Sequence, residues 1–197
     1  MVDMSVLTRT TPRRGVRLGD RLRWGSGLLA LALLVGACSS SAPADSDVEA
    51  ADDRWRTIPL RDVRSGQEFR INDLDGKVVA IETMAIWCAN CRTQQLEARE
   101  ALDRLADPDL VYVSLDVDPN ERAEELAEYA RREGFAWHFA VASPELLRSL
   151  AASFGDQVLS PPATPLLVLG ADGEVVEEGI GIKRADQLVA LFEEHLP

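Results

Sequence analysis

The 197-residue chain has few side chains that bind metal ions, with only three cysteines and two histidines. A structural zinc site takes four nitrogen or sulfur ligands. Cys88 and Cys91 could supply two of them, but the histidines are His138, in a strand-like stretch, and His195, near the C-terminus. We therefore expect no structural zinc site and place no metal ligand among the site residues.

The sequence also lacks an apolar run long enough for a comfortable bilayer crossing, which takes about 20 residues. Its longest candidate, residues 24–37, has 14 residues even when it is counted generously. Six arginines and two acidic residues precede it. A basic segment followed by a short apolar segment is the layout of a bacterial export signal. We interpret residues 1–37 as a signal peptide.

The apolar segment ends in the sequence VGAC, at Cys38. This resembles the lipobox of bacterial lipoproteins, in which the cysteine is lipidated and becomes the new N-terminus. The Ser-, Ala- and Asp-rich residues that follow have few apolar groups to bury, so residues 38–54 are expected to form a flexible tether. The alternative is a plain secretory signal with an incidental Cys38. We expect an exported lipoprotein that is anchored in a bacterial membrane and faces the extracytoplasmic space.

Positive charge is scarce in the expected mature protein. The full chain has a formal charge of −12, and without residues 1–37 it keeps 15 basic and 31 acidic residues. Such a surface repels the phosphates of nucleic acids and anionic lipid headgroups. We expect no nucleic-acid partner and a domain that stands away from the membrane surface.

Strand and helix patterns alternate after residue 54, which predicts an α/β domain. Asn120 and Ser143 are candidate N-caps, and Gly134 is a candidate helix end. No internal repeat is present. The expected strands are residues 56–60, 67–71, 77–84, 110–117, 135–142, 164–170 and 175–181, and the expected helices are residues 88–106, 121–133, 144–154 and 184–196.

The motif Cys88-Ala89-Asn90-Cys91 could be a redox pair, half of a metal site or an ordinary disulfide. A bridge between residues so close in sequence closes almost no loop and adds little entropic stability. Because the motif lies between a buried strand and a helix, Cys88 is expected at the first helical turn. The free N–H groups and the helix dipole there favour its thiolate. Cys91, one turn later, can attack the resulting mixed disulfide. We predict that Cys88 is the nucleophile and Cys91 the resolving cysteine.

The sequence WCANCR after an apolar run resembles the active site of the thioredoxin superfamily. Residues 164–174, TPLLVLGADGE, resemble the proline strand of that family, with Pro165 eight residues before Gly173. The N-terminal hairpin and residues 135–155 resemble the TlpA/ResA branch of extracytoplasmic thiol-disulfide oxidoreductases. The resemblance implies a thioredoxin-like fold for residues 55–197, with a central mixed β-sheet flanked by helices, an N-terminal β-hairpin and a central αβ insertion.

The resemblance also implies roles for residues around the cysteines. Thr164-Pro165 would be a cis peptide lying against the CxxC motif, and the backbone of Thr164 would pair with an extended substrate. Trp87 would be part of an exposed apolar rim around Cys88; the alternative is a tryptophan in the core. Ala89 and Asn90 would contact the substrate. The Ala-Asn dipeptide and Gln94 depart from the family pattern, which leaves the direction of electron flow open.

Glu82 lies six residues before Cys88, where thioredoxins carry a buried acid. Burial raises the pKa of a carboxyl group, which would let Glu82 take the proton of Cys91 during attack. The alternative is that strand alternation points Glu82 at solvent or at Arg92.

The functional expectation is a membrane-tethered thiol-disulfide oxidoreductase with no cofactor besides its own disulfide. By family analogy its partners are protein thiols and disulfides outside the cytoplasmic membrane and a membrane electron donor of the CcdA or DsbD kind, and the protein is a monomer. Two alternatives share the fold. One is a copper chaperone of the Sco type, although Sco proteins use CxxxC and a later histidine. The other is a non-catalytic binding module.

Overall fold

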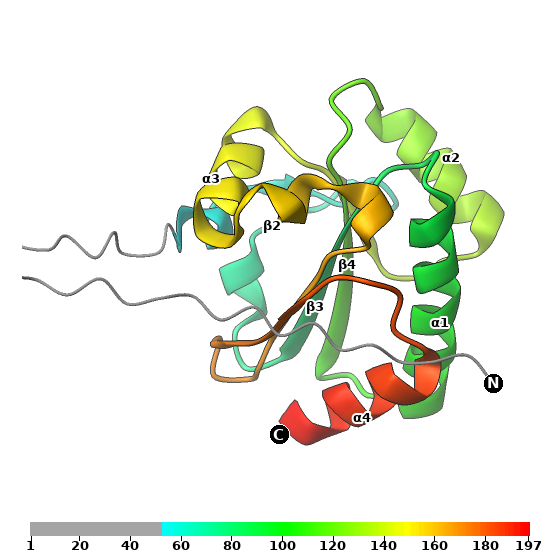
Figure 1. Cartoon of the computed structure of the whole chain (residues 1–197), viewed down its shortest axis with the longest axis vertical. Helices are drawn as coiled ribbons and strands as arrows, with labels where there is room; N and C mark the ends of the chain where they lie inside the picture. Colours follow the sequence, from blue (N-terminus) through cyan, green and yellow to red (C-terminus); the bar gives the residue numbers. More distant parts are fainter. Residues whose placement is uncertain (1–52) are drawn as a thin grey trace, which may run out of the picture. The chain divides into compact units, whose positions relative to one another are not determined.

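The computed structural model describes residues 53–197, so the predicted signal peptide and the predicted lipidation site Cys38 lie outside the described residues. Five strands form one mixed sheet in the order β5-β4-β3-β6-β7 (Figure 1). The parallel part comprises β3 (Val78–Met84), β4 (Leu110–Asp116) and β5 (His138–Val141). β6 (Leu166–Leu169) pairs antiparallel with β3, and β7 (Val175–Gly179) pairs antiparallel with β6. This confirms the predicted α/β class and the antiparallel edge.

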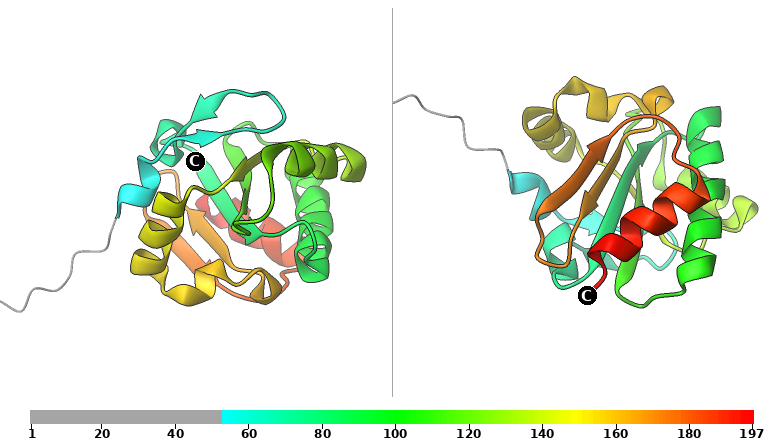
Figure 2. Two further views of the ribbon diagram at one scale, coloured as in Figure 1. Left: turned by 90° about the horizontal axis from the view of Figure 1, so that it is seen from above. Right: turned by 60° about the horizontal axis from the view of Figure 1, so that its bottom comes forward.

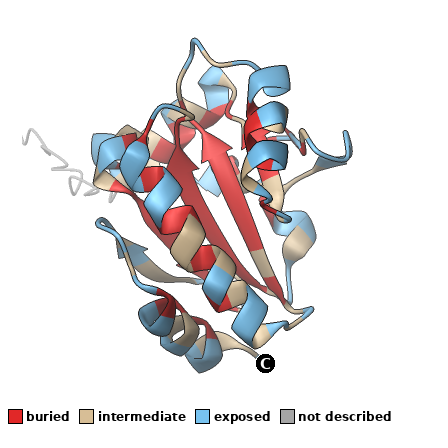
Figure 3. Ribbon diagram, turned by 90° about the vertical axis from the view of Figure 1, so that its right-hand side faces the viewer, coloured by how far each residue is buried: buried red, intermediate tan, exposed pale blue. Residues whose placement is uncertain are grey.

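The central strand β3 is buried along its whole length because helices cover both faces of the sheet (Figure 3). On one face lie α1 (Ala89–Leu105), α2 (Ala123–Glu133) and α4 (Ala185–His195). On the other face lies α3 (Pro144–Phe154). A strand covered on both sides reads as a continuous apolar run, which explains the pattern of residues 77–84.

No helix within residues 53–197 is long and apolar enough to cross a membrane.

The helices α1 and α4 pack against each other on their shared face (Figure 2). Buried Gln94, in α1, accepts a hydrogen bond from the Lys183 N–H at 2.7 Å and donates to the Lys183 carbonyl at 3.2 Å. Glu97 accepts from the N–H of Ala185 at 2.7 Å, at the first residue of α4. These contacts join the helix that carries the cysteines to the C-terminal helix.

The N-terminal hairpin is shorter than predicted. Its strands are β1 (Leu60–Arg61) and β2 (Glu68–Phe69), whereas residues around Trp55 form the 3-10 helix η1 (Asp53–Arg56). The buried Asp62 carboxylate ends the pairing because it accepts hydrogen bonds from the Ser65 hydroxyl at 2.6 Å and from the turn N–H groups. It also accepts from the Phe139 N–H, which joins the hairpin to β5.

The start of α2 differs from the prediction, since Arg122 and not Asn120 is the N-cap. Asp118 accounts for the difference: its carboxylate accepts hydrogen bonds from both the backbone and the side-chain nitrogen of Asn120, each at 2.9 Å. These bonds hold residues 118–121 in a turn before the helix begins. The helix ends at Gly134 as predicted, with φ of 73° in the left-handed region that glycine adopts without strain.

Ser143 caps α3 as predicted, because its hydroxyl accepts a hydrogen bond from the Leu146 N–H at 3.2 Å. Replacing this residue in Ser143→Ala leaves that N–H unpaired, so we expect a loss of about 1 kcal/mol in the free energy of unfolding. Urea denaturation would measure the change. Ser143→Thr keeps the hydroxyl and should retain most of the stability; equal losses in both variants would contradict a capping role.

Candidate active site

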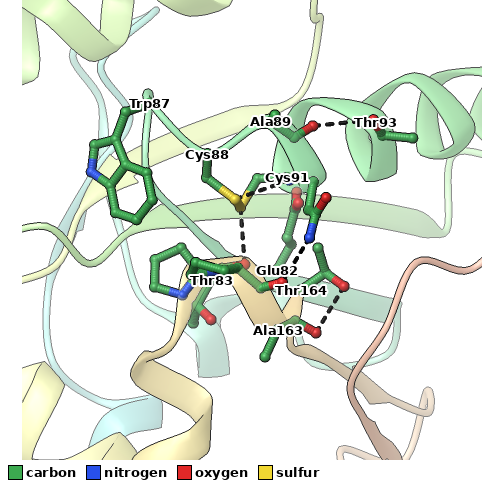
Figure 4. Close-up of a disulfide and its surroundings, with 12 residues drawn as sticks. Glu82, Thr83, Trp87, Cys88, Ala89, Cys91, Thr93, Ala163 and Thr164 are labelled. Carbon is green, nitrogen blue, oxygen red and sulfur yellow. Dashed lines mark hydrogen bonds between the residues drawn. A yellow bond between two sulfur atoms is a disulfide. The ribbon is translucent and has the colours of Figure 1, made fainter.

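The two cysteines of the CxxC motif form a disulfide at the point where β3 passes into α1 (Figure 4). Cys88 is the N-cap of α1, and its sulfur accepts a hydrogen bond from the Cys91 N–H at 3.1 Å. The first turn of α1 carries no acidic residue that would oppose a negative sulfur. The free N–H groups of the helix start and the helix dipole therefore favour a thiolate at Cys88 once the disulfide is reduced.

Cys91 has a different environment. It is fully buried, and its sulfur lies 3.2 Å from the carbonyl oxygen of Pro161. In the reduced protein a thiol at this position can donate its proton to that oxygen, whereas a thiolate would face the oxygen's lone pairs. Both sulfurs are therefore buried, Cys88 at 3% exposure and Cys91 at 0%, but their surroundings differ: the helix start favours a negative Cys88 sulfur, and the Pro161 carbonyl oxygen disfavours a negative Cys91 sulfur.

Glu82 lies on the face of β3 that α1 covers, opposite Ser114 of β4 and Leu166 of β6. It is fully buried, so it points neither at solvent nor at Arg92, which pairs with Glu133 at 2.8 Å. One carboxyl oxygen accepts hydrogen bonds from the Ser114 hydroxyl at 3.2 Å and the Tyr112 hydroxyl at 3.4 Å. Burial raises the pKa of Glu82 to about 8, although the nearby Gln95 amide and the hydroxyl groups of Ser114 and Tyr112 offset part of the effect.

Further polar side chains surround this carboxyl group, and two hydrogen bonds connect them. Trp137 donates to the Ser114 hydroxyl oxygen at 2.9 Å, and Tyr129 donates to the side-chain oxygen of Gln95 at 2.5 Å. Gln95 follows Cys91 by one helical turn and is completely buried. A carboxyl group with a pKa of about 8, on the sheet face that the Cys91-bearing helix covers, can accept and return one proton near that pH. Sequence reasoning named Glu82 but missed Gln95 and Tyr129, because their helical spacing is also that of ordinary core residues.

Trp87 is 60% exposed, and its indole nitrogen donates to Asp118 at 2.7 Å. The expected exposed rim is therefore present, and Asp118 fixes the ring's orientation. Two other large apolar side chains are exposed among the described residues, Ile180 at 59% and Ile182 at 42%. Between them Gly181, with φ of 89°, donates its N–H to the Ala163 carbonyl at 2.7 Å, which joins this loop to the turn beside the cysteines.

The expectation of a cis peptide at Thr164-Pro165 is wrong, since the described residues contain no cis peptide bond. The chain instead turns into β6 through Thr164 itself, which adopts the left-handed conformation with φ of 49° and ψ of 61°. Its N–H donates to the Pro161 carbonyl at 2.8 Å, and both Thr164 and Pro165 are buried. In this conformation the Thr164 N–H is occupied, and it is the preceding residues that border the disulfide.

Those preceding residues form the short 3-10 helix η4 (Pro161–Ala163). Besides the contact of Pro161 with Cys91, the side-chain amide of Asn90 donates to the Pro162 carbonyl at 2.9 Å. Ala89 and Asn90 are exposed, as expected for the middle of the motif. Only the long-range contact with α1 identifies Pro161 and Pro162 as site residues.

A second buried acid near the site was not anticipated. Asp116, at the end of β4, is fully buried, and burial raises its pKa to about 8, with the neighbouring Glu121 carboxyl adding to the effect. Glu121 in turn accepts the Ile86 N–H at 2.8 Å, in the segment before Trp87. Sequence reasoning could not identify Asp116 as a buried acid, because an aspartate at the end of an apolar strand is common and is usually exposed.

His138 contacts the hairpin and has no described contact with the cysteines. The His138 ring nitrogen lies 3.6 Å from Asp62 and its ring packs on Phe69 at 4.8 Å, three residues before the end of β5. Within residues 53–197 no group of three histidine, cysteine, aspartate or glutamate side chains is arranged to hold a metal ion.

Solved structures of other proteins share this fold. A thioredoxin-family thiol:disulfide interchange protein from Chlorobium tepidum TLS aligns with a TM-score of 0.58 and 21% identity, over 71% of this chain and 93% of that chain. The chain has a thioredoxin-like fold. A secreted Mycobacterium tuberculosis disulfide oxidoreductase, homologous to E. coli DsbE, shares this fold with a TM-score of 0.56 and 14% identity, over 72% and 98% of the two chains. So does BsSco, a Sco-family cytochrome c oxidase assembly protein, with a TM-score of 0.56 and 18% identity, over 70% and 90%.

Comparison of the sequence alone adds no closer relation for this thioredoxin-like chain. No family model matches it, and no curated protein matches it. At these identities the structural matches establish the fold, and the function has to be argued from the site.

Proposed function

We propose that this protein is a thiol-disulfide oxidoreductase that exchanges its Cys88–Cys91 disulfide with thiols and disulfides of other proteins. The observation that carries the proposal is the asymmetry of the pair: Cys88 caps α1 and accepts the Cys91 N–H, while Cys91 is buried against a carbonyl oxygen. An ordinary stabilising disulfide needs no such difference between its two sulfurs. The Chlorobium thiol:disulfide interchange protein and the Mycobacterium disulfide oxidoreductase are named for the same chemistry.

In the reducing direction, the Cys88 thiolate attacks a sulfur of the partner's disulfide, forms a mixed disulfide and releases the partner's other sulfur as a thiolate. Cys91 then attacks the Cys88 sulfur, which frees the partner's second thiolate and restores the Cys88–Cys91 disulfide. Cys91 must lose its proton for this step, and Glu82 is the buried base that we assign to it. The oxidising direction runs through the same steps in reverse. The exposed Trp87, Ile180 and Ile182 offer an apolar surface for the partner.

We further propose that the protein acts outside the cytoplasmic membrane, tethered there through lipid on Cys38, with a membrane thiol-disulfide carrier as electron donor. The support is the sequence of residues 1–38, in which a basic and then an apolar segment end in VGAC. Mass spectrometry of Cys38 in the native host, with and without inhibition of lipoprotein processing by globomycin, tests the anchor. An unmodified chain that still begins before Cys38 would contradict it.

Capture of partners tests the proposed reaction. Cys91→Ser cannot resolve a mixed disulfide, so in the native host it should accumulate exported proteins linked to Cys88. The matched control Cys88→Ser/Cys91→Ser should capture none. Insulin reduction by the wild-type protein gives an independent measure. No captured partner together with no insulin reduction would refute the oxidoreductase.

The Sco-type copper chaperone remains the second candidate, because BsSco is among the structural matches. Thiolates bind Cu(I), but His138 is engaged with Asp62 and Phe69 and lies at the start of β5, away from the end that borders the cysteines. Titration with Cu(I) separates the two functions. Tight binding that needs both cysteines and His138 would favour the chaperone, whereas binding unaffected by His138→Ala would not.

A further inference from the structure

The disulfide is nearly inaccessible in this structure. Cys88 is only 3% exposed and Cys91 is completely buried. The turn η4 passes directly beside the two sulfurs, as Figure 4 shows, and packs against the first residues of α1. An attacking sulfur must approach Cys88 along the line of the S–S bond, on the side away from Cys91. With so little of Cys88 exposed, part of its surroundings has to move before that approach is possible.

Two side-chain contacts hold η4 against the CxxC motif. Asn90 donates its side-chain amide to the Pro162 carbonyl at 2.9 Å, and the Cys91 sulfur lies 3.2 Å from the Pro161 carbonyl. Asn90 is the only one of the four motif residues whose side chain reaches across to Pro162 by a hydrogen bond. Asn is also a poorer helix former than Ala, so its presence in the first turn of α1 is better explained by this contact than by helix stability.

We propose that Asn90 is a positioning residue that holds the Pro161–Ala163 turn over the disulfide and so selects which thiols reach Cys88. This inference rests on the proposed function. A partner protein can displace the turn because it supplies its own polar groups to Pro162 and its own apolar side chains to Trp87 and Ile180. A small reductant supplies neither and must wait for the turn to open. Asn90 thereby disfavours small thiols relative to protein partners.

The step that the turn restricts is a simple displacement. The incoming thiolate forms a bond to the Cys88 sulfur while the Cys88–Cys91 bond breaks, and the electron pair passes to Cys91, which then takes up a proton. Loss of the Asn90 contact leaves the reacting atoms unchanged and alters only the frequency with which the turn opens. Because the loss of one hydrogen bond makes opening of the turn easier, the disulfide should be reduced about two- to tenfold faster.

Reduction by tris(2-carboxyethyl)phosphine tests the proposal, because this reagent is small and works from acidic to alkaline pH. The phosphine attacks a sulfur, and with water it yields the phosphine oxide and two thiols. Rates for each variant are divided by the wild-type rate at the same pH, in high salt to screen charge differences. The disulfide of Asn90→Ala should be reduced about two- to tenfold faster than that of the wild type at every pH. The control Thr93→Ala, in the same exposed turn of α1 but bonded only to the Ala89 carbonyl, should match wild type.

Asn90→Asp separates a role in holding the turn from a general loss of helix stability. Below the pKa of its carboxyl group the protonated aspartate can still donate to the Pro162 carbonyl, so this variant should approach the wild-type rate at acidic pH. At pH 8 its carboxylate repels that carbonyl, and the rate should rise above wild type. Hydrogen exchange at the amides of Ala163 and Thr164, which close η4, should accelerate in the fast variants.

Three results would overturn the inference: Asn90→Ala at the wild-type rate, Thr93→Ala as fast as Asn90→Ala, or Asn90→Asp with no pH dependence relative to wild type. None of them depends on partner proteins. A failure of the proposed function would appear elsewhere, as a wild-type protein that neither reduces insulin nor captures partners.

Discussion

A Cys91→Ser variant, which keeps Cys88 as its single thiol within residues 53–197, is expected to react with an aromatic disulfide at pH 7 about 100-fold faster than Cys88→Ser. The reason is the difference between the two sulfur positions. Cys88 accepts the Cys91 N–H at the start of α1, which stabilises a thiolate. Cys91 is fully buried, and the Pro161 carbonyl oxygen opposes a negative charge on it.

Release of the thiolate chromophore from 5,5′-dithiobis(2-nitrobenzoic acid) measures both rates. The chain carries Cys38 as well, so each variant is made with Cys38→Ser to leave one thiol. Rates that are equal within a factor of three would mean that the two sulfurs are interchangeable. The order of attack and resolution proposed for the reaction would then lose its structural basis.

Glu82→Gln is expected to make the protein more stable, and increasingly so as the pH rises. Burial raises the pKa of Glu82 to about 8, from 4.5 as an ordinary glutamate. Between these two pH values the folded protein holds a proton that the unfolded chain has released, so rising pH favours unfolding. The loss continues up to the folded pKa, with a limiting slope of about 1.4 kcal/mol per pH unit for one group. Glutamine has no proton to lose and keeps a similar shape.

Urea denaturation at pH 5, 6.5 and 8 measures this difference. The buried Asp116, whose pKa burial also raises to about 8, contributes a slope of the same sign in both proteins and cancels from the comparison. Glu178→Gln, at an exposed position of β7, is the matched control and should change stability little. A constant stability difference between Glu82→Gln and wild type across this range would contradict a Glu82 carboxyl group whose pKa is raised by burial.

The same substitution separates stability from function. Glutamine cannot accept the proton of Cys91, so release of a partner from the mixed disulfide should slow by about 100-fold, even though the protein is more stable. Formation of the mixed disulfide by Cys88 should change much less, because Cys88 draws its stabilisation from the helix start. Single-turnover measurements with a labelled peptide disulfide resolve these two steps. Equal slowing of both steps would assign Glu82 a general structural role.

Much of the fold was predictable because its local signals agree with its tertiary structure. The apolar run at residues 77–84 predicted a central strand, and β3 is buried from end to end. Ser143 and Gly134 marked helix ends correctly, since a cap or a left-handed glycine depends only on neighbouring backbone. The hairpin strands and the start of α2 were misplaced. At both places the side chain of an aspartate, Asp62 or Asp118, redirects backbone hydrogen bonds.

For the site, the sequence by itself determined which chemistry is available. It placed two cysteines at a strand-to-helix junction, where the helix start distinguishes one sulfur from the other, and it put Glu82 within a buried strand. Local spacing suffices for these features. It does not suffice for contacts between segments that are distant in sequence, because those contacts depend on the path that the chain takes between β5 and β6.

Only the tertiary structure decided what covers the disulfide. It put Pro161 and Pro162 beside Cys91 and Asn90, with Thr164 turning the chain through a left-handed conformation where a cis peptide had been expected. It also surrounded Glu82 with hydroxyl groups from β4, across a sheet register that no single segment encodes. Burial and long-range hydrogen bonds set the access to Cys88 and the proton affinity of Glu82, and both arise from the packing of α1, β4 and η4 around β3.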